Sequence, residues 1–260
     1  MRTKEATEER RRRQSKTLPR YSVSEEFWNF VTHGIGAVFA IFAAVFLMVA
    51  SSRQGQASVI FFMLIYSLTL INLFSFSAVY HGSGQNLTLR RRAQKGDHLS
   101  ISITLAGMVT AVVGGALDSA VAYILVALAW VFAGCASVMN LLDVKKYRAQ
   151  SMVCYVATAL LPFTVIAQLH RAMGTAGVIL FVLSGVLVGA GIVFYGLGKN
   201  DKKRLRIHNS KTIVVFARRV LKKDYKITYH AGREYYHTIW HLLTLSAAAL
   251  NFAAIMVGIL

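Results

Sequence analysis

The sequence predicts an all-α polytopic membrane protein, a bundle of seven transmembrane helices with its N-terminus in the cytoplasm and its C-terminus outside. Three observations lead to this prediction. The 260-residue chain is 55% hydrophobic and only 15% charged, whereas soluble domains are nearer 25% charged. Seven apolar stretches have the length of roughly 20 residues that a helix needs to cross a bilayer. The basic residues gather in alternate connections between these stretches.

The apolar stretches define the expected elements. They cover residues 28–50, 57–80, 98–117, 119–142, 151–169, 175–198 and 236–257. Gly and Asp residues near Asp118 predict a tight turn between the third and fourth spans. Pro162 is expected to kink the fifth span. Gly185 and Gly189 form a Gly-x-x-x-Gly pair in the sixth, which predicts close packing against another helix.

The domain organisation follows from the same pattern. We expect a basic cytoplasmic tail over residues 1–24 and a single transmembrane domain over 25–260, with a long basic cytoplasmic loop at about 199–235. The tail and the even-numbered loops hold 27 of the 29 Lys and Arg residues. Cytoplasmic loops carry such an excess, and this fixes the predicted orientation.

The net charge of +18 would also suit a nucleic-acid-binding protein. However, the basic residues are confined to short segments between long uncharged stretches, which is the pattern of membrane spans with basic loops. We therefore expect no nucleic-acid partner. The basic loops are expected to contact anionic lipid headgroups instead.

Four polar clusters fall at the cytoplasmic ends of spans in this topology. They are Glu25 to Gly34, Ser77 to His81, Lys95 to His98, and His237 to His241. Ionisable groups near the bilayer core are costly, so each cluster needs a reason. The topology was derived from loop charge alone, yet it places all four clusters at one membrane level. This convergence predicts a functional site there.

The spacing of the histidines favours a metal site. His237 and His241 are four residues apart, so they lie on one helix face about 6 Å apart along its axis. His81 is the best candidate for a third ligand from a neighbouring span, and Ser77 lies one turn deeper on the same face. Three His ligands with an open fourth position are typical of catalytic zinc. Asp97 would hold the zinc-bound water or act as general base.

Three further residues are candidates for supporting roles around that set. Glu26 would accept a hydrogen bond from His33 or face the basic loops. His33 would orient a ligand or cap a contact within the bundle. His98 would support the site or extend toward the membrane surface, and the second reading is favoured. A His pair at helical spacing also arises by chance, and interfacial histidines often only anchor a span.

The same clusters resemble the motifs of a known family. Glu26 with Asn29, Thr32, His33 and Gly34, the run from Ser77 to His81, Asp97-His98 with Ile101, and His237-x-x-x-His241 with Leu242 are similar to the ordered motifs of the hemolysin III branch of the progestin and adipoQ receptor family. Gly191 to Tyr195 is a weaker match. The resemblance covers about residues 22–258. One departure lies in the third span, where Gly107-Met-Val-Thr110-Ala111 replaces the family's frequent Gly-Thr-Tyr-Thr-Pro run, and we expect it to alter the cavity beside Asp97.

The resemblance implies a role for each matched residue. His81, His237 and His241 would bind zinc, Asp97 would contact the metal-bound water, and Ser77 would lie close by. The superfamily's similarity to alkaline ceramidases implies a zinc-dependent hydrolase of a lipid amide or ester, acting in lipid homeostasis in a bacterial-type plasma membrane. Two alternatives stay open: a sensor or receptor-like regulator of membrane state with structural zinc, and, less favoured, a pore-forming cytolysin.

Overall fold

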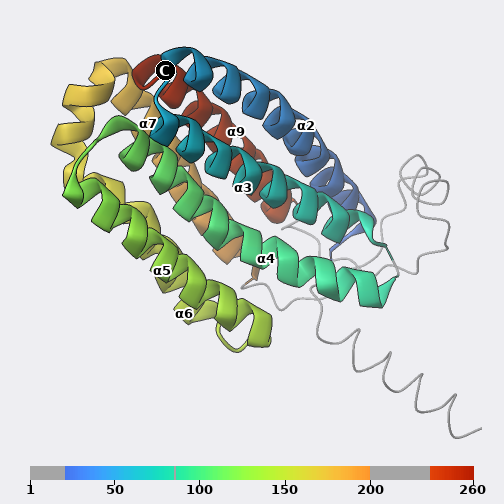
Figure 1. Ribbon diagram of the computed structural model, residues 1–260. Helices are drawn as coiled ribbons and strands as arrows, with labels where there is room; N and C mark the ends of the chain where they lie inside the picture. Colours follow the sequence, from blue (N-terminus) through green and yellow to red (C-terminus); the bar gives the residue numbers. More distant parts are fainter. Residues whose placement is uncertain (1–20, 85, 200–234) are drawn as a thin grey trace, which may run out of the picture.

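The computed structural model describes residues 21–84, 86–199 and 235–260, and these residues form an all-α bundle (Figure 1). Most of the expected basic tail and most of the expected loop at about 199–235 lie outside the described residues. The helices are α2 (Val23–Gln54), α3 (Ala57–Gly82), α4 (Leu87–Val109) with a π-helical extension (Thr110–Gly114), α5 (Ala120–Asp143), α6 (Arg148–Leu160), α7 (Ile166–Lys199) and α9 (Tyr236–Gly258).

Most successive helices pack side by side, and the last one returns to the first. α2 packs on α3, α3 on α4, α4 on α5 and α5 on α6, while α9 lies against both α7 and α2. The chain end of α9 meets the end of α2, where the Gln54 side chain donates to the Ile259 carbonyl. Within the described residues, α6 and α7 share no extensive backbone contact. The bundle is therefore open between these two helices.

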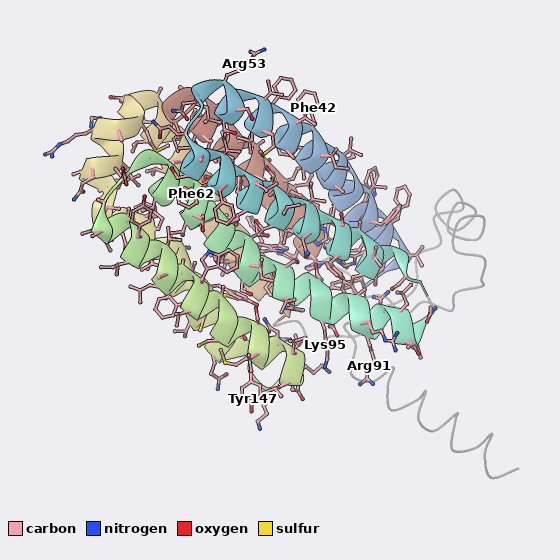
Figure 2. The ribbon with its side chains drawn as sticks, in the orientation of Figure 1. Phe42, Arg53, Phe62, Arg91, Lys95 and Tyr147 are labelled. Carbon is pink, nitrogen blue, oxygen red and sulfur yellow. The ribbon has the colours of Figure 1, made fainter. Side chains whose placement is uncertain are left out.

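The outer surface of the bundle is apolar. Large hydrophobic side chains such as Val38, Phe42 and Leu142 are exposed on it (Figure 2). The buried face of α5, in contrast, is made mainly of alanines, including Ala129 and Ala136. Six helical stretches of the described chain are long and apolar enough to cross a membrane. This distribution is that of a multi-pass membrane protein, whose large apolar groups face lipid.

One of the six stretches, Arg148–Leu197, has 50 residues, which as a straight helix would measure about 75 Å. It is not straight. Pro162 lies in a 3₁₀ turn (Leu161–Val165), which confirms the predicted distortion. Gly174 has φ +70° and ψ 174°, a backbone conformation that favours glycine. The break at Gly174 divides the stretch into two pieces of about 25 residues each, long enough to span a bilayer of about 30 Å.

Two other expectations meet different outcomes. The turn between α4 and α5 lies where the sequence predicted it, with the Ser119 side chain accepting from the backbone amide of Ala122 at the start of α5. The prediction that Gly185 and Gly189 permit close helix packing is wrong. A Cβ atom built on Gly189 would meet nothing within 4 Å, and one on Gly185 would touch only the Phe163 ring at 3.6 Å. Both glycines instead line a cavity.

Candidate metal centre and its cavity

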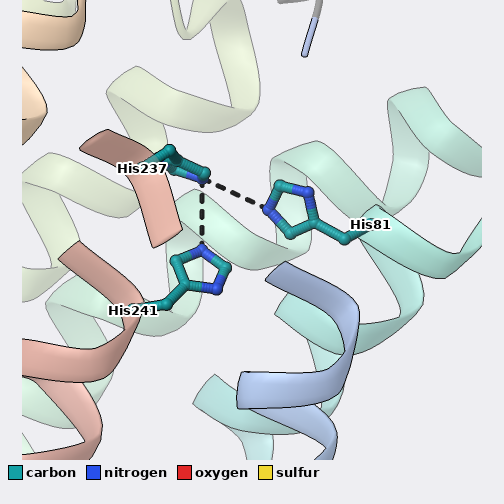
Figure 3. A group of neighbouring side chains, drawn as sticks. All are labelled: His81, His237 and His241. Carbon is teal, nitrogen blue, oxygen red and sulfur yellow. Dashed lines mark hydrogen bonds between the residues drawn. The ribbon is translucent and has the colours of Figure 1, made fainter. Parts of the chain in front are cut away.

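Three imidazoles from two helices meet at one end of the bundle (Figure 3). His81 is the second-last residue of α3, while His237 and His241 lie one turn apart at the start of α9. The Nε2 atom of His237 is 3.2 Å from that of His81 and 3.2 Å from that of His241. Tetrahedral zinc with Zn–N bonds of 2.0–2.1 Å would place its ligand nitrogens about 3.3 Å apart. Two of the three separations have this value, and all three ligand atoms lie within 4.8 Å of one another, so the donor set could hold a metal ion.

The opposite nitrogens of two of these rings have hydrogen-bond acceptors. The Nδ1 of His81 lies 2.7 Å from the Oε2 of Glu26, and the Nδ1 of His241 lies 3.2 Å from the Asn29 carbonyl. A carboxylate and a carbonyl can only accept, so both Nδ1 atoms carry the proton. Both Nε2 atoms then keep a free lone pair directed at the common centre. This is the tautomer that binds a metal, fixed by the partners that ligand histidines usually have.

Glu26 faces a residue of the basic second loop, which is one of the two interpretations that the sequence suggested. Its carboxylate does not bond His33 but bridges His81 and the guanidinium of Arg90 on α4. The Arg90 side chain also lies over the Tyr80 ring, at 5.0 Å from the ring centre. The arginine charge offsets that of the carboxylate, which also contacts His81, in a largely buried position.

His33 supports the site by packing. Its ring is buried and stacks on that of His241, with centroids 3.5 Å apart and an interplanar angle of 14°. The Phe74 ring meets it edge-on from the other side, at 5.1 Å. The neighbouring Asn29 accepts a 2.6 Å bond from Thr238, which joins α2 to α9. These contacts fix the ring of His241 in place.

Asp97 and Ser77 lie beside the three imidazoles, on α4 and α3. The Ser77 hydroxyl adjoins the Asp97 carboxyl but does not form a hydrogen bond with a described residue that meets the usual geometric limits. The backbone carbonyl of His98 accepts bonds from Asn140 at 3.3 Å and from the Tyr155 hydroxyl at 3.0 Å. This network joins the turn of α4 that carries Asp97 to α5 and α6. His98 itself is not one of the three converging ligands.

A cavity of about 480 Å³ begins at the metal centre and runs along the helices. Asp97, His237 and His241 line one end of it. From there it continues past Phe163 and Phe181, which lie several turns deeper in the bundle. Its walls are mostly apolar, and it passes the opening between α6 and α7. The shape suits a long apolar ligand with one polar end at the histidines.

Two aromatic residues of the site had escaped the sequence analysis. Tyr21, just before α2, stacks on His237 with ring centroids 4.7 Å apart, and its burial raises its pKa well above the ordinary value. Tyr195, met before only in the weaker α7 motif, lies 5.6 Å from the same ring. The imidazole of His237 thus contacts two phenol rings. Tyr21 has no sequence signal beyond its aromatic character, and the weak motif that contains Tyr195 does not predict its contact with His237, because contacts between distant helices set both positions.

Comparison with known proteins places this arrangement in a family. The family model for haemolysin-III related proteins matches residues 21–252. The chain belongs to the haemolysin-III related family. It is 24% identical over 238 residues to Hemolysin-3 of Bacillus cereus, covering 92% of this chain and 93% of the relative. It is 25% identical over 236 residues to a Hemolysin-3 homolog of Bacillus subtilis strain 168, covering 91% and 95%. The resemblance stated from the motifs is therefore confirmed.

The departure in the third-span motif lies deeper in this haemolysin-III relative than expected. Thr110 and Ala111 are buried in the core within the π-helical turn, about 20 Å along the helix from Asp97. The Thr110 hydroxyl accepts a 3.0 Å bond from the Trp130 indole. Of this run, Met108 lines the cavity. Thr110 and Ala111 therefore lie away from Asp97, and the part of this run that lines the cavity is Met108, about 16 Å along the helix from Asp97.

Proposed function

We propose that this haemolysin-III relative is a zinc-dependent hydrolase of an acyl lipid, acting on an amide or ester bond at the membrane surface. The observation that carries the proposal is the convergence of three imidazoles on the end of a long apolar cavity, with the Nε2 of His237 3.2 Å from the Nε2 of each of the other two. A site with three histidines leaves a fourth position open, as catalytic zinc sites do. The cavity accounts for the lipid, because its apolar walls suit an acyl chain.

Each residue of the site would have a distinct role. Bound zinc would act as a Lewis acid on the scissile carbonyl and acidify water. Glu26 and Asn29 hold the ligand rings in the metal-binding tautomer through His81 and His241. Asp97 is the general base that would take a proton from the attacking water and pass it to the leaving group. Ser77 would orient the Asp97 carboxyl.

The proposal includes an orientation in the membrane. With Gly174 separating two spans, the described segments give seven crossings, and the loop charges then put the metal centre at the cytoplasmic leaflet. In Figure 2, Arg91 and Lys95, two residues of the basic second loop, lie at the opposite end of the bundle from Arg53, the single basic residue of the first loop. The membrane would be the plasma membrane, and the activity would serve lipid homeostasis there.

A direct test uses the full-length protein purified in detergent. We expect about one zinc per chain by plasma mass spectrometry, and fatty-acid release from at least one member of a panel of ceramides, N-acyl amines and lysolipids. Asp97→Asn should keep its zinc and lose turnover by at least 100-fold, the scale of general base catalysis. Asp118→Asn, at the far end of α4, is the matched control. Stoichiometric zinc with no turnover on any lipid would refute the hydrolase.

One observation favours a second function, that of a membrane-state sensor in which zinc only joins helices. The ligands come from α3 and α9, so a bound ion would tie together distant parts of the chain. This function predicts that His237→Ala chiefly lowers the melting temperature, while Asp97→Ala remains active in cells. Loss of the cellular phenotype in a folded, zinc-loaded Asp97→Ala protein would exclude it. Pore formation, which the relatives' names suggest, has less support, because the site's ionisable groups gather at one end of the bundle.

A further inference from the structure

The rim of the cavity carries positive charge. Besides its apolar walls, the cavity is lined at the metal end by Gln94 of α4, Lys145 of the turn after α5 and Arg148 at the start of α6. Lys145 and Arg148 are both exposed. The only acidic residue among the described lining residues is Asp97. A ligand entering this cavity therefore meets two cations before it reaches the metal centre.

These cations belong to the cavity wall through the geometry of their helices. On α6 the lining residues recur at intervals of three and four, as Arg148, Ser151, Met152, Tyr155 and Val156, so they form one face of the helix. Arg148 is the first residue of that face. On α4 the corresponding face begins at Gln94, one turn outside Asp97. The polar rim therefore lies about one turn, roughly 5 Å, beyond the level of Asp97.

Lys145 and Arg148 form no ion pair with any residue that the structure describes. The closest acidic group in sequence, Asp143, accepts from the backbone amides of Lys145 and Lys146, at 2.8 and 3.0 Å, and its charge attracts both lysine side chains without forming an ion pair. General retention of basic loops in the cytoplasm explains Arg92 and Lys146, which do not line the cavity. It does not explain why two cations without an ion-pair partner among the described residues lie at the mouth of the cavity.

The apolar part of the cavity sets the size of the tail that would enter. Its lining on α6 extends from Arg148 to Leu160, and on α4 from Gln94 to Met108, which is about 18–21 Å of helix. One leaflet of the hydrocarbon core is about 15 Å thick. The cavity can therefore hold one membrane acyl chain over most of its length, with the polar end of the lipid at the cationic rim.

We propose that the ligand of this cavity is an acyl lipid whose headgroup carries a phosphate, which Lys145 and Arg148 bind while the acyl chain fills the apolar part. A guanidinium binds phosphate oxygens through paired N–H donors, and an ammonium adds a point charge. The identification of this lipid as the substrate rests on the proposed function. The proposal that this lipid binds does not rest on the proposed function. The cationic rim and the apolar part of the cavity lie on either side of the metal centre.

The test measures binding to protein stripped of metal with a chelator, so that no turnover interferes. The probe is a fluorescent 1-acyl-glycerol phosphate, with the monoacylglycerol of the same chain length as the neutral comparison. The protein should bind the phosphate-bearing lipid at least tenfold more tightly than the neutral one. The double variant Lys145→Gln/Arg148→Gln should lose this preference but keep the affinity for the neutral lipid. The matched control Arg92→Gln/Lys146→Gln should keep both.

Three results would overturn the proposal. One is equal affinity of the wild-type protein for the two lipids. Another is that the control variant loses its preference for the phosphate-bearing lipid as fully as the double variant does. That result would mean that the overall surface charge, and not the cationic rim, causes the preference. The third is competition by glycerol phosphate as effective as by the acylated compound, which would indicate a site for free phosphate. Selective binding together with no hydrolysis of any lipid of the panel by the zinc-loaded protein would instead refute the proposed function and leave the headgroup site standing.

Discussion

Apart from the three histidine ligands, Glu26 is the residue that we expect to affect zinc affinity most. It accepts from the Nδ1 of His81 at 2.7 Å and holds the guanidinium of Arg90. We expect Glu26→Gln to weaken zinc binding by roughly 10- to 100-fold, the usual effect of removing a partner of a ligand histidine. The neutral amide accepts more weakly, and Arg90 then adds an uncompensated positive charge nearby.

Zinc affinity is measured by competition with a chromogenic chelator. Asp118→Asn serves as the control, because Asp118 lies in the turn at the other end of α4 and bonds Tyr123. An unchanged zinc affinity in Glu26→Gln would show that the carboxylate does not set the tautomer of His81.

The sequence predicted the three converging histidines but not the contacts of Glu26 with His81 and Arg90, for a physical reason. His237 and His241 share a helix face by spacing alone, and loop charge put His81 at the same membrane level. The bond between Glu26 and His81 depends on how α2 and α3 are rotated about their axes, which no local pattern records. Arg90 looked like one of several loop charges until its contact with Glu26 was visible. The specific roles of Asp97 and Ser77 remain predictions.

The cavity-facing side of α7 shows how one residue of a helix can set ligand size. Gly189 lines the cavity, and a Cβ atom there would meet nothing within 4 Å. We expect Gly189→Leu to fold normally and keep its zinc, while its side chain fills part of the acyl site. Affinity for long acyl chains should fall at least tenfold, and shorter chains should be affected less.

The measurement compares a series of fluorescent acyl lipids of increasing length, with the melting temperature as a check of folding. Gly134→Leu on α5 is the matched control, since a Cβ there also has open space but Gly134 does not line the cavity. An equal loss of affinity for every chain length, or the same loss in the control, would mean that α7 does not form the acyl site.

For the secondary-structure elements, the sequence located the helices correctly but suggested a helix–helix contact at Gly185 and Gly189 that the structure does not have. Apolar length located the helices, and Pro162 located the distortion after α6. The Gly185 and Gly189 pair suggested a helix contact because small residues usually permit one. That inference failed because the same lack of side chains also makes room for a cavity. Whether a glycine stripe faces a helix or a space depends on where the neighbouring helices lie.

For the molecule as a whole, a bound metal would stabilise the bundle by joining α3 to α9. We expect removal of zinc to lower the melting temperature in detergent and its return to restore it, because a ligand that binds only the folded state adds about 2.7 kcal/mol at 100 times its Kd. Differential scanning fluorimetry with a chelator measures this shift, and His237→Ala should show none. An equal response to added magnesium would argue against a specific site, since three imidazoles favour zinc over hard cations.

The position of the bundle in the membrane gives the last prediction. The tail and even-numbered loops carry 27 of the 29 basic residues, so the metal centre should face the cytoplasm and the turn at Asp118 should face outward. In a background with Cys135→Ser and Cys154→Ser, Arg53→Cys and Asp118→Cys should react with an impermeant maleimide on intact cells. Arg92→Cys and Lys146→Cys should react only after permeabilisation. Labelling of Lys146→Cys on intact cells would reverse the orientation and place the site's chemistry on the outer leaflet.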